Sequence, residues 1–421
     1  MVNFIKNKSN LLNLNLIIIS IFPILLIVGP LFSEIGMLTI IFSFFYLNKD
    51  NFFKKINLKY FGLFVTFILL LILSSLISDY KLFSLKSSLL YPRFFLFSLA
   101  ISFFLVKSKQ LIRVCFYFLL GTFVILIIDS TLQYFVGKNM IGIELISNRA
   151  SSFFGDELIL GSFVVRLFPL LIFFILNEFY ERLSFKFLLL IFTLFCLVDL
   201  TVILSGERTS FFLLILEKII IIISIKKLRT TVFYNLLVMI MGLLFLINFS
   251  SNFNLRLIVE TKQYTNMNIM SKNFRPYSTE HSELFETSYQ MFLKNKFLGV
   301  GPKNFRNHCS DKEYKMDRRF SCSTHSHNFY IQLLAECGLL TFLILIYIYI
   351  KSFKLYFIKL SDKQNQKLKD SFILCLITFS INFWPFVTSG NFFNNWMNMI
   401  IYLPLGFLIY NYINISHKNK T

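Results

Sequence analysis

The stretch CSTHSHNFYIQLLAECGLLTFLILI (residues 322–346) joins a polar loop to a long apolar segment. A helix that begins next to His327 would place Asn328, Gln332 and Glu336 four residues apart, on one face. At a rise of about 1.5 Å per residue, Glu336 would lie roughly 13 Å deeper than His327. A polar stripe that runs so far into an apolar helix is expected to face the interior of a helical bundle.

The composition around this stretch is that of a membrane protein. Of the 421 residues, 56% are hydrophobic and only 15% are charged, which is far more apolar than a water-soluble domain of this length requires. The formal net charge is +20, a balance that in a soluble protein would suggest nucleic-acid binding. In a membrane protein the cations instead indicate topology, because cytoplasmic connections carry an excess of Lys and Arg. We therefore expect membrane lipids as partners and no nucleic acid.

A membrane-spanning helix needs about 20 mostly apolar residues, and this criterion predicts about twelve spans. The predicted fold is all-α: a polytopic membrane protein with one long loop between spans nine and ten. We expect spans one to nine within residues 1–250, the loop at 251–327 and spans ten to twelve within 328–421. The individual spans are 11–29, 31–47, 60–77, 89–106, 111–136, 157–177, 186–204, 208–225, 232–250, 328–350, 370–388 and 394–414.

The distribution of cations orients this bundle. Connections on one side are rich in lysine, with four in residues 49–59 and six in residues 351–369. The short connections on the other side carry few cations, namely Lys81, Lys86, Lys138, Arg149 and Arg208. By the positive-inside rule, both termini are cytoplasmic and the long loop is extracytoplasmic.

Loop 251–327 is too long for a simple connector, and loops of this length are usually functional or disordered. Its segment SELFETSYQMFLKN (residues 282–295) has apolar residues at helical spacing, which predicts an amphipathic helix. Two of the six cysteines, Cys309 and Cys322, lie in the same loop. Outside the cytoplasm we expect them to form a disulfide; the alternative is two unpaired thiols.

Ionisable groups near or inside membrane spans are costly and tend to be functional. In this sequence they gather on the expected outer side. A lone arginine at the end of a span is also a common interfacial anchor. Arg208 differs because the short turn in SGERTSFF holds its guanidinium near the interface, and a fixed guanidinium suits phosphate. The group on this side comprises Asp129, Arg149, Asp156, Glu157, Arg166, Asp199, Glu207, Arg208, Arg256, Arg275, His281, His325 and His327.

Three interpretations of His325 and His327 remain open on the residues alone. One is a general base beside a set of phosphate-binding arginines, because an imidazole keeps a neutral fraction near pH 7. A second is a metal site built from these two residues, His308 and the loop cysteines, although their spacing matches no closed zinc signature. The third is a purely structural role in helix capping and packing.

The segment THSHNFYIQLLAECGLLT (residues 324–341) resembles the signature of the O-antigen ligase and O-antigen polymerase superfamily. That signature is His, then Asn, Ser or Gln, nine residues, Gly, two residues, then Gly, Thr or Tyr. His327, Asn328, Gly338 and Thr341 fit it. The segments NKFLGVGPKNFRNHC, LSGERTSFF, IDSTLQYFVGKNMIG and RASSFFGDELILGSFVVRLFPL also look like members of this group. The resemblance covers about residues 125–345.

The resemblance implies a glycosyltransferase of the bacterial inner membrane that acts in envelope glycan and lipopolysaccharide biosynthesis, with a periplasmic loop and active site. Such enzymes move a glycan from undecaprenyl diphosphate to a hydroxyl of the lipid A core in ligases, or of a growing glycan in polymerases. By analogy, His327 would deprotonate the acceptor, which attacks the anomeric carbon with inversion. Arg208 and a loop arginine would stabilise the leaving diphosphate. The resemblance implies no metal, nucleotide or other cofactor, since the donor carries the activated bond.

The second diphosphate contact departs from the family pattern. Family ligases usually carry an arginine in an Arg-x-x-x-Leu context about fifty residues before the histidine, whereas this region reads NFRPYSTEHSELF. Arg275 or His281 could serve there, and Arg149 and Arg166 are further candidates. The residues expected to support the site are His325, Asn328, Glu336, His281 and Asp129.

Two other functions remain as alternatives: a polytopic transporter of lipid-linked glycan and a protein O-oligosaccharyltransferase. A transporter should show repeated halves with polar residues near the midplane. In this chain the polar residues gather at one end, and the long loop interrupts any pseudo-symmetry. The sequence therefore favours a transferase, while ligase and polymerase, the sugar, the acceptor and the oligomeric state stay open.

Overall fold

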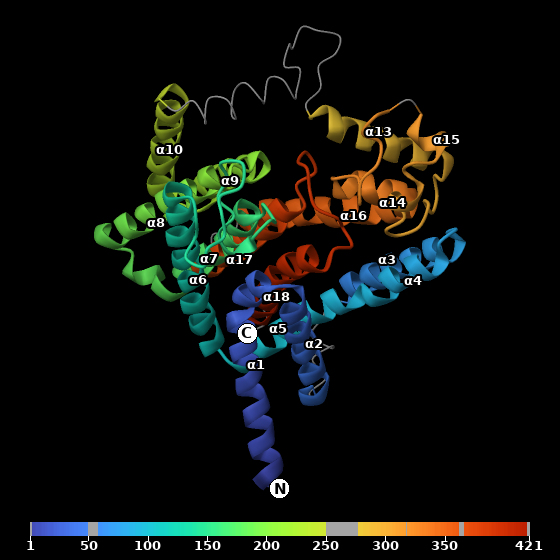
Figure 1. The fold of residues 1–421 in the computed structure, drawn as a ribbon. Helices are drawn as coiled ribbons and strands as arrows, with labels where there is room; N and C mark the ends of the chain where they lie inside the picture. The colour runs from blue at the N-terminus through green and yellow to red at the C-terminus, as the bar shows by residue number, and fades with distance from the viewer. Residues whose placement is uncertain (1, 49–57, 250–276, 317, 362–365, 419–421) are drawn as a thin grey trace.

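The computed structural model describes residues 2–48, 58–249, 277–316, 318–361 and 366–418. The regular elements in these ranges are helices (Figure 1). They are α1 (Val2–Val28), α2 (Pro30–Leu47), α3 (Leu58–Ile77), α4 (Lys81–Leu90), α5 (Pro92–Lys107), α6 (Gln110–Val136), α7 (Leu160–Phe179), α8 (Phe185–Ser205), α9 (Arg208–Ser224), α10 (Arg229–Phe249), α13 (Thr279–Lys294), α14 (Phe305–His308), α15 (Lys312–Lys315), α16 (Phe329–Ser361), α17 (Gln366–Asn382) and α18 (Asn395–Lys418). Two short 3-10 turns, Ser152–Phe154 and Tyr180–Arg182, flank α7.

Nine segments of the described chain are long and apolar enough to cross a membrane, which makes this a polytopic membrane protein. They coincide with all the predicted spans except 60–77, 208–225 and 370–388. These three are also helical, as α3, α9 and α17, but the apolar part of α3 is only Phe61–Ile77, and α9 and α17 have 17 residues each. The count of twelve spans therefore stays a prediction. Helix α13 covers most of the segment where an amphipathic helix is expected.

Prolines and serines begin several of these helices. Pro30 and Pro92 occupy the first turns of α2 and α5, where proline is tolerated because the first N–H groups of a helix have no partner within it. Ser278 caps α13, since its hydroxyl accepts a hydrogen bond from the backbone N–H of His281 at 3.3 Å. That cap also places His281 in the first turn of α13.

The centre of the bundle is formed by α5, α7, α17 and α18 (Figure 1). Helix α7 is buried along nearly its whole length and packs against α6, α8, α9 and α17. Its predominantly apolar surface, with Arg166 as a buried exception, is what an enclosed helix requires. Helix α10, which contacts α8 and α9, lies at the periphery, with most of its side chains outside the protein core.

Helix α16 is interrupted at Gly338, where φ is +74° and ψ is −177°. The loop between α13 and α14 enters this interruption and pairs with its backbone. A buried backbone group without a partner is costly, above all inside a membrane protein, so the loop and the helix break stabilise each other. Three hydrogen bonds join them: Val300 N to Ala335 O at 3.1 Å, Gly301 N to Glu336 O at 2.8 Å and Leu339 N to Lys296 O at 2.8 Å.

Glycine is required on both sides of this contact. A Cβ atom on Gly338 would collide with the backbone of Phe297, and one on Gly299 would collide with the backbone of Glu336. Both glycines also have positive φ, at +74° and +68°, a region that other residues rarely adopt. The signature glycine of the sequence thus has a steric reason.

We expect Gly338→Ala to destabilise the protein by at least about 2 kcal/mol, because it adds strain at positive φ to a backbone collision. The matched control is Gly121→Ala in α6, where a Cβ would meet open space. Thermal unfolding of the purified protein in detergent measures both. Equal melting temperatures for the two variants would show that the interruption of α16 does not need glycine.

Candidate active site

Three of the five histidines gather where α16 begins. The ring centroids of His325 and His327 are 4.0 Å apart. The ring of His281, from α13, lies 5.2 Å from that of His327. The structure therefore brings the predicted base together with two of the residues that are expected to support it.

The backbone at His327 has the left-handed φ of +56°, which is uncommon for a residue other than glycine. The loop before α18 holds this conformation, because the N–H of Ser389 donates to the carbonyl of His327 at 2.8 Å. Asn328 then begins α16: its side-chain oxygen accepts from the N–H groups of Tyr330 and Ile331 at 3.0 and 3.2 Å. A strained backbone held in this way is frequent at functional sites.

The polar stripe of α16 is buried and faces the protein interior. Its side chains bind the backbones of two loops, one before α14 and one before α18, so that those loops bury few unpaired groups. Gln332 also donates to Glu336 at 3.0 Å. The contacts are Asn328 Nδ2 to Pro385 O at 2.9 Å and Val387 O at 3.0 Å, Gln332 Oε1 from Phe392 N at 2.9 Å, and Glu336 from the N–H groups of Lys303 and Phe305, both at 3.0 Å.

Both ring nitrogens of His325 are engaged. Nδ1 lies 2.9 Å from the hydroxyl of Thr324, and Nε2 lies 3.3 Å from the carbonyl of Ser389. A carbonyl can only accept, so Nε2 carries the proton of the neutral ring. Burial lowers the pKa of His325 to about 3, and His327 adds to this effect. These contacts suit a residue that supports the site.

His327 is less engaged: among the described residues its one side-chain hydrogen bond is between Nε2 and the hydroxyl of Ser323, at 3.4 Å. Burial lowers its pKa to about 4, and His281 adds to this effect. Burial also lowers the pKa of His281, although Glu280 opposes the shift. All three imidazoles are therefore neutral at pH 7, and His327 keeps a ring nitrogen able to accept a proton.

We expect the protein to lose stability as pH falls from 7 towards 4. The imidazoles titrate near pH 6.5 in the unfolded chain, above their pKa values in the fold, so acid protonates the unfolded state first and favours it. The fall of the melting temperature between pH 7 and pH 4 measures this loss of stability. It should be smaller in the double variant His281→Asn/His325→Gln. His308→Gln, outside the cluster, is the control. If the melting temperature of the double variant falls as much as that of the wild type, the clustered histidines are not the cause of the acid sensitivity.

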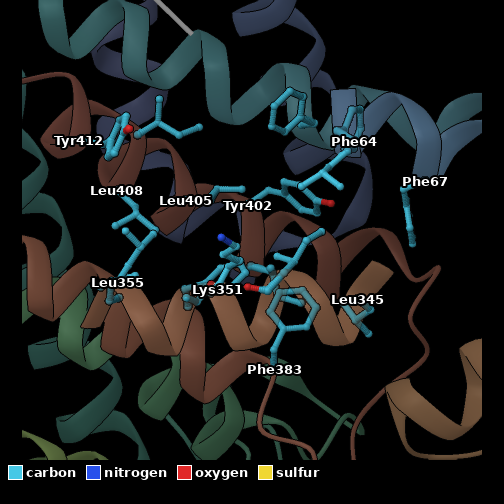
Figure 2. Close-up of a pocket in the computed structure, with 18 of the residues that line it drawn as sticks. Phe64, Phe67, Leu345, Lys351, Leu355, Phe383, Tyr402, Leu405, Leu408 and Tyr412 are labelled. Atoms are coloured by element: carbon cyan, nitrogen blue, oxygen red, sulfur yellow. Dashed lines mark hydrogen bonds between the residues drawn. The ribbon is translucent and has the colours of Figure 1, made fainter. Parts of the chain in front are cut away.

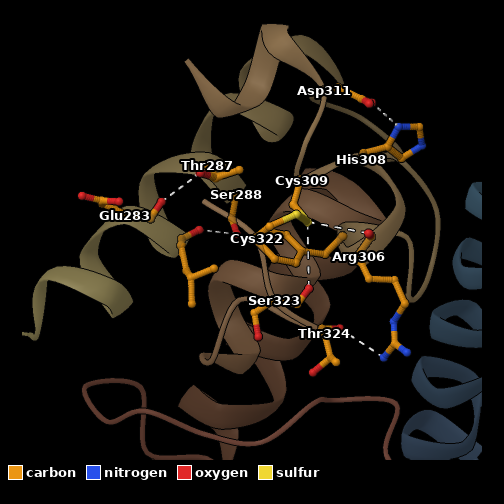
Figure 3. Close-up of a disulfide and its surroundings, with 12 residues drawn as sticks. Glu283, Thr287, Ser288, Arg306, His308, Cys309, Asp311, Cys322, Ser323 and Thr324 are labelled. Atoms are coloured by element: carbon orange, nitrogen blue, oxygen red, sulfur yellow. Dashed lines mark hydrogen bonds and ion pairs between the residues drawn. A yellow bond between two sulfur atoms is a disulfide. The ribbon is translucent and has the colours of Figure 1, made fainter. Parts of the chain in front are cut away.

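The loop cysteines Cys309 and Cys322 are bonded to each other (Figure 3). Their disulfide joins the end of α14 to the segment that leads to the histidines. Beside it, Arg306 Nη2 donates to the carbonyl of Thr324 at 3.1 Å. His308 lies on the opposite side of the disulfide in Figure 3 and contacts Asp311 at 2.9 Å. The metal-ligand set considered from the sequence therefore does not assemble, because its sulfur atoms bind each other and His308 is engaged elsewhere.

We expect replacement of both loop cysteines by serine to destabilise the protein by about 3 kcal/mol, the value for closing a loop of this length. The two cysteines are 13 residues apart. Unfolding under non-reducing conditions measures the loss. Cys196→Ser, which removes a free cysteine, is the comparison. If reduction of the wild-type protein leaves its melting temperature unchanged, the tether is not needed for stability.

Arg208 is the first residue of α9 and is half-buried. The hydroxyl of the next residue, Thr209, lies 2.7 Å from that of Thr388. Thr388 precedes Ser389, which binds His327, and consecutive Cα atoms are about 3.8 Å apart. The N-terminus of α9 and the imidazoles are therefore held by neighbouring residues of one loop.

Two further predicted arginines lie around the same helix end. Arg149 Nε donates to the carbonyl of Ser205 at 2.9 Å, and Arg166, which is buried, donates from Nη1 to Asn382 at 2.7 Å. Glu207, which precedes α9, accepts hydrogen bonds from the N–H groups of Gly161 and Ser162 in the first turn of α7, at 2.6 and 3.0 Å. These contacts hold the N-terminal part of α7 against the ends of α8, α9 and α17.

Another predicted residue, Asp129, takes part in a different set of contacts. Asp129 is buried and accepts hydrogen bonds from the N–H of Met140 at 2.8 Å and the hydroxyl of Ser152 at 2.5 Å. Its role is therefore to hold the loop that follows α6. Arg275 lies outside the described residues.

Sequence reasoning misses two parts of the site. One is the loop before α18, whose segment NFWPFVTSGNFFNN (residues 382–395) is rich in Asn, Ser and Thr between two apolar spans. The other is Arg306, an exposed arginine whose charge contributes to the lowered pKa of His325. The polar composition of the loop is a usable signal, whereas the proximity of Arg306 depends on the fold.

Together, these features define a polytopic helical membrane protein with neutral imidazoles and cationic groups at one end of its bundle. Residues 189–346 match the family model described as O-Antigen ligase and form an O-antigen ligase family domain. This domain includes Arg208, Gly338 and the three clustered histidines. It implies a membrane enzyme that transfers glycans. No curated protein matches the chain.

Proposed function

We propose that this protein transfers a glycan from undecaprenyl diphosphate to an acceptor sugar hydroxyl at the periplasmic face of the bacterial inner membrane, as an O-antigen ligase or polymerase. The observation that carries the proposal is the contact of one loop with both His327 and the N-terminus of α9. A proton acceptor and a cationic group then lie at the same end of an O-antigen ligase family domain.

The acceptor side of the reaction is assigned to His327. Its neutral imidazole would take the proton of the acceptor hydroxyl while that oxygen attacks the anomeric carbon. His325 and His281 are also neutral at pH 7, so they would add no positive charge beside His327. A charged neighbour in either place would weaken the base further.

The donor side is assigned to Arg208. As the acceptor oxygen bonds to the anomeric carbon from one face, the bond from that carbon to the diphosphate breaks on the other, so the configuration inverts. The electron pair leaves with the diphosphate, whose growing charge is stabilised by fixed cations. Arg208 and the positive end of α9 meet that need. For the loop arginine that would assist Arg208 at the diphosphate, we propose Arg306, which is exposed beside the disulfide.

We expect His327→Ala to lower the rate of glycan transfer by about 10²- to 10⁴-fold, the usual contribution of a general base. Proteoliposomes supplied with lipid-linked donor and acceptor measure the rate. His308→Gln is the matched control, because that imidazole binds Asp311 beyond the disulfide. Transfer at the wild-type rate in His327→Ala would remove this residue from the mechanism.

The same variant separates transfer from transport. A transferase without its base leaves the lipid-linked donor to accumulate at the periplasmic face, whereas a blocked transporter leaves it at the cytoplasmic face. Ligase and polymerase differ in the surface glycan of a deletion strain. A polymerase mutant shows single units on the core, and a ligase mutant shows bare core. Transfer to protein side chains would identify the oligosaccharyltransferase alternative.

A further inference from the structure

A cavity of about 250 Å³ lies between α3, α5, α16, α17 and α18 (Figure 2). Most of its wall is phenylalanine, leucine and isoleucine, for example Phe64, Phe95, Leu376 and Leu405. It is separate from the histidine cluster and takes no part in the proposed reaction. A cavity with such a wall suits a hydrocarbon chain.

The polar groups of this cavity are unevenly distributed. At the end near the loop before α18, Tyr91 donates its hydroxyl to Asn398 at 3.0 Å and stacks on Phe392. That end therefore offers an apolar surface. Further along α16 and α18 the wall carries Lys351, whose ammonium group lies near the middle of the cavity in Figure 2, and Ser352, with the hydroxyl-bearing rings of Tyr347 and Tyr412. The cavity thus combines a long apolar wall with one small polar region.

Lys351 is the one charged residue among those that line the cavity. Figure 2 shows its ammonium group pointing from α16 into the space beneath Leu405 and Tyr402. The nitrogen lies 5.5 Å from the centre of the Tyr347 ring. No carboxylate of the described chain lies within 4 Å of it. A cation that faces apolar surroundings without a counter-ion is costly, so the position calls for an anion.

The part of the cavity that holds Lys351 lies towards the membrane side opposite the histidines. Lys351 follows the interruption at Gly338 by 13 residues, about 20 Å along the helix. Tyr412 lies 17 residues beyond the start of α18 at Asn395, about 25 Å along that helix. Tyr347 and Tyr412 are 38% and 36% exposed, so this part opens at the surface of the bundle. The sequence of the segment 351–369 contains five more lysines, and a lysine-rich connection attracts anionic headgroups.

We propose that this cavity binds an anionic phospholipid from the leaflet opposite the histidine cluster, with its phosphate at Lys351 and an acyl chain along the apolar wall. The position of the cation relative to the membrane argues for this occupant. A phospholipid of that leaflet carries its headgroup on the side of Lys351 and its chains towards the midplane. A glycan donor that is bound at His327 would carry its diphosphate at the other end and would leave Lys351 facing hydrocarbon.

The test compares the effect of two lipids on the full chain, purified in detergent. Phosphatidylglycerol should raise the melting temperature more than phosphatidylcholine, because a ligand stabilises the state that binds it. Lys351→Met should lose this preference, whereas Lys351→Arg should keep it. Lys354→Met is the matched control: Lys354 is on the same helix and exposed, but it does not line the cavity, so this variant should keep the preference.

Three results would overturn the proposal. Lys351→Met could keep the full preference for phosphatidylglycerol, or Lys354→Met could lose as much of it, which would indicate general charge attraction. Alternatively, undecaprenyl phosphate could protect the wild type and Lys351→Met equally while phosphatidylglycerol has no effect, which would make the cavity a site for a polyprenyl chain. The melting temperature of each variant in phosphatidylcholine shows that it is folded.

Discussion

Backbone hydrogen bonds inside a membrane protein have no substitute, because lipid cannot replace them and water is excluded. Helix α16 interrupts its own ladder at Gly338, and the freed groups are bound by the backbone of residues 296–301. Glu336, two residues before the break at Gly338, accepts hydrogen bonds from two more N–H groups of the same loop. These hydrogen bonds fix the loop against the bundle. The loop is therefore a rigid part of the site.

The remaining loops are attached by the same kind of contact. Asn328 and Gln332 bind the backbone before α18, and that loop in turn binds His327 and Thr209. The disulfide closes the segment between α14 and the histidines. Residues from α9, α13 and two loops are therefore held at one end of the bundle with little freedom. Preorganised groups of this kind stabilise charge that develops during a reaction without having to reorient.

Burial at this end has an electrostatic consequence. It lowers the pKa of His327 to about 4, so the imidazole is neutral at pH 7 while cations lie at neighbouring positions. In the proposed reaction, a neutral base and a fixed guanidinium would act on opposite sides of the bond between the anomeric carbon and the diphosphate. The apolar cavity has the reverse organisation, with Lys351 as the one charged residue in its wall. In the proposed orientation, the two ends of the bundle would present different surfaces to the two leaflets.

The sequence by itself determined the class of the fold, most of the long apolar helices and the choice of the catalytic candidate. Long apolar runs specify membrane helices through local composition, and the signature around His327 is contiguous in the chain. Tertiary structure alone decided what the polar stripe does. The spacing of Asn328, Gln332 and Glu336 places them on one inward face, but their partners lie in loops far away in sequence. Tertiary structure also decided which residues lie close together. His281 and Arg306 lie near His325 and His327 because the interrupted helix and the disulfide hold their loop against the bundle. Local pattern cannot encode such contacts, since they arise from pairing buried groups between distant segments.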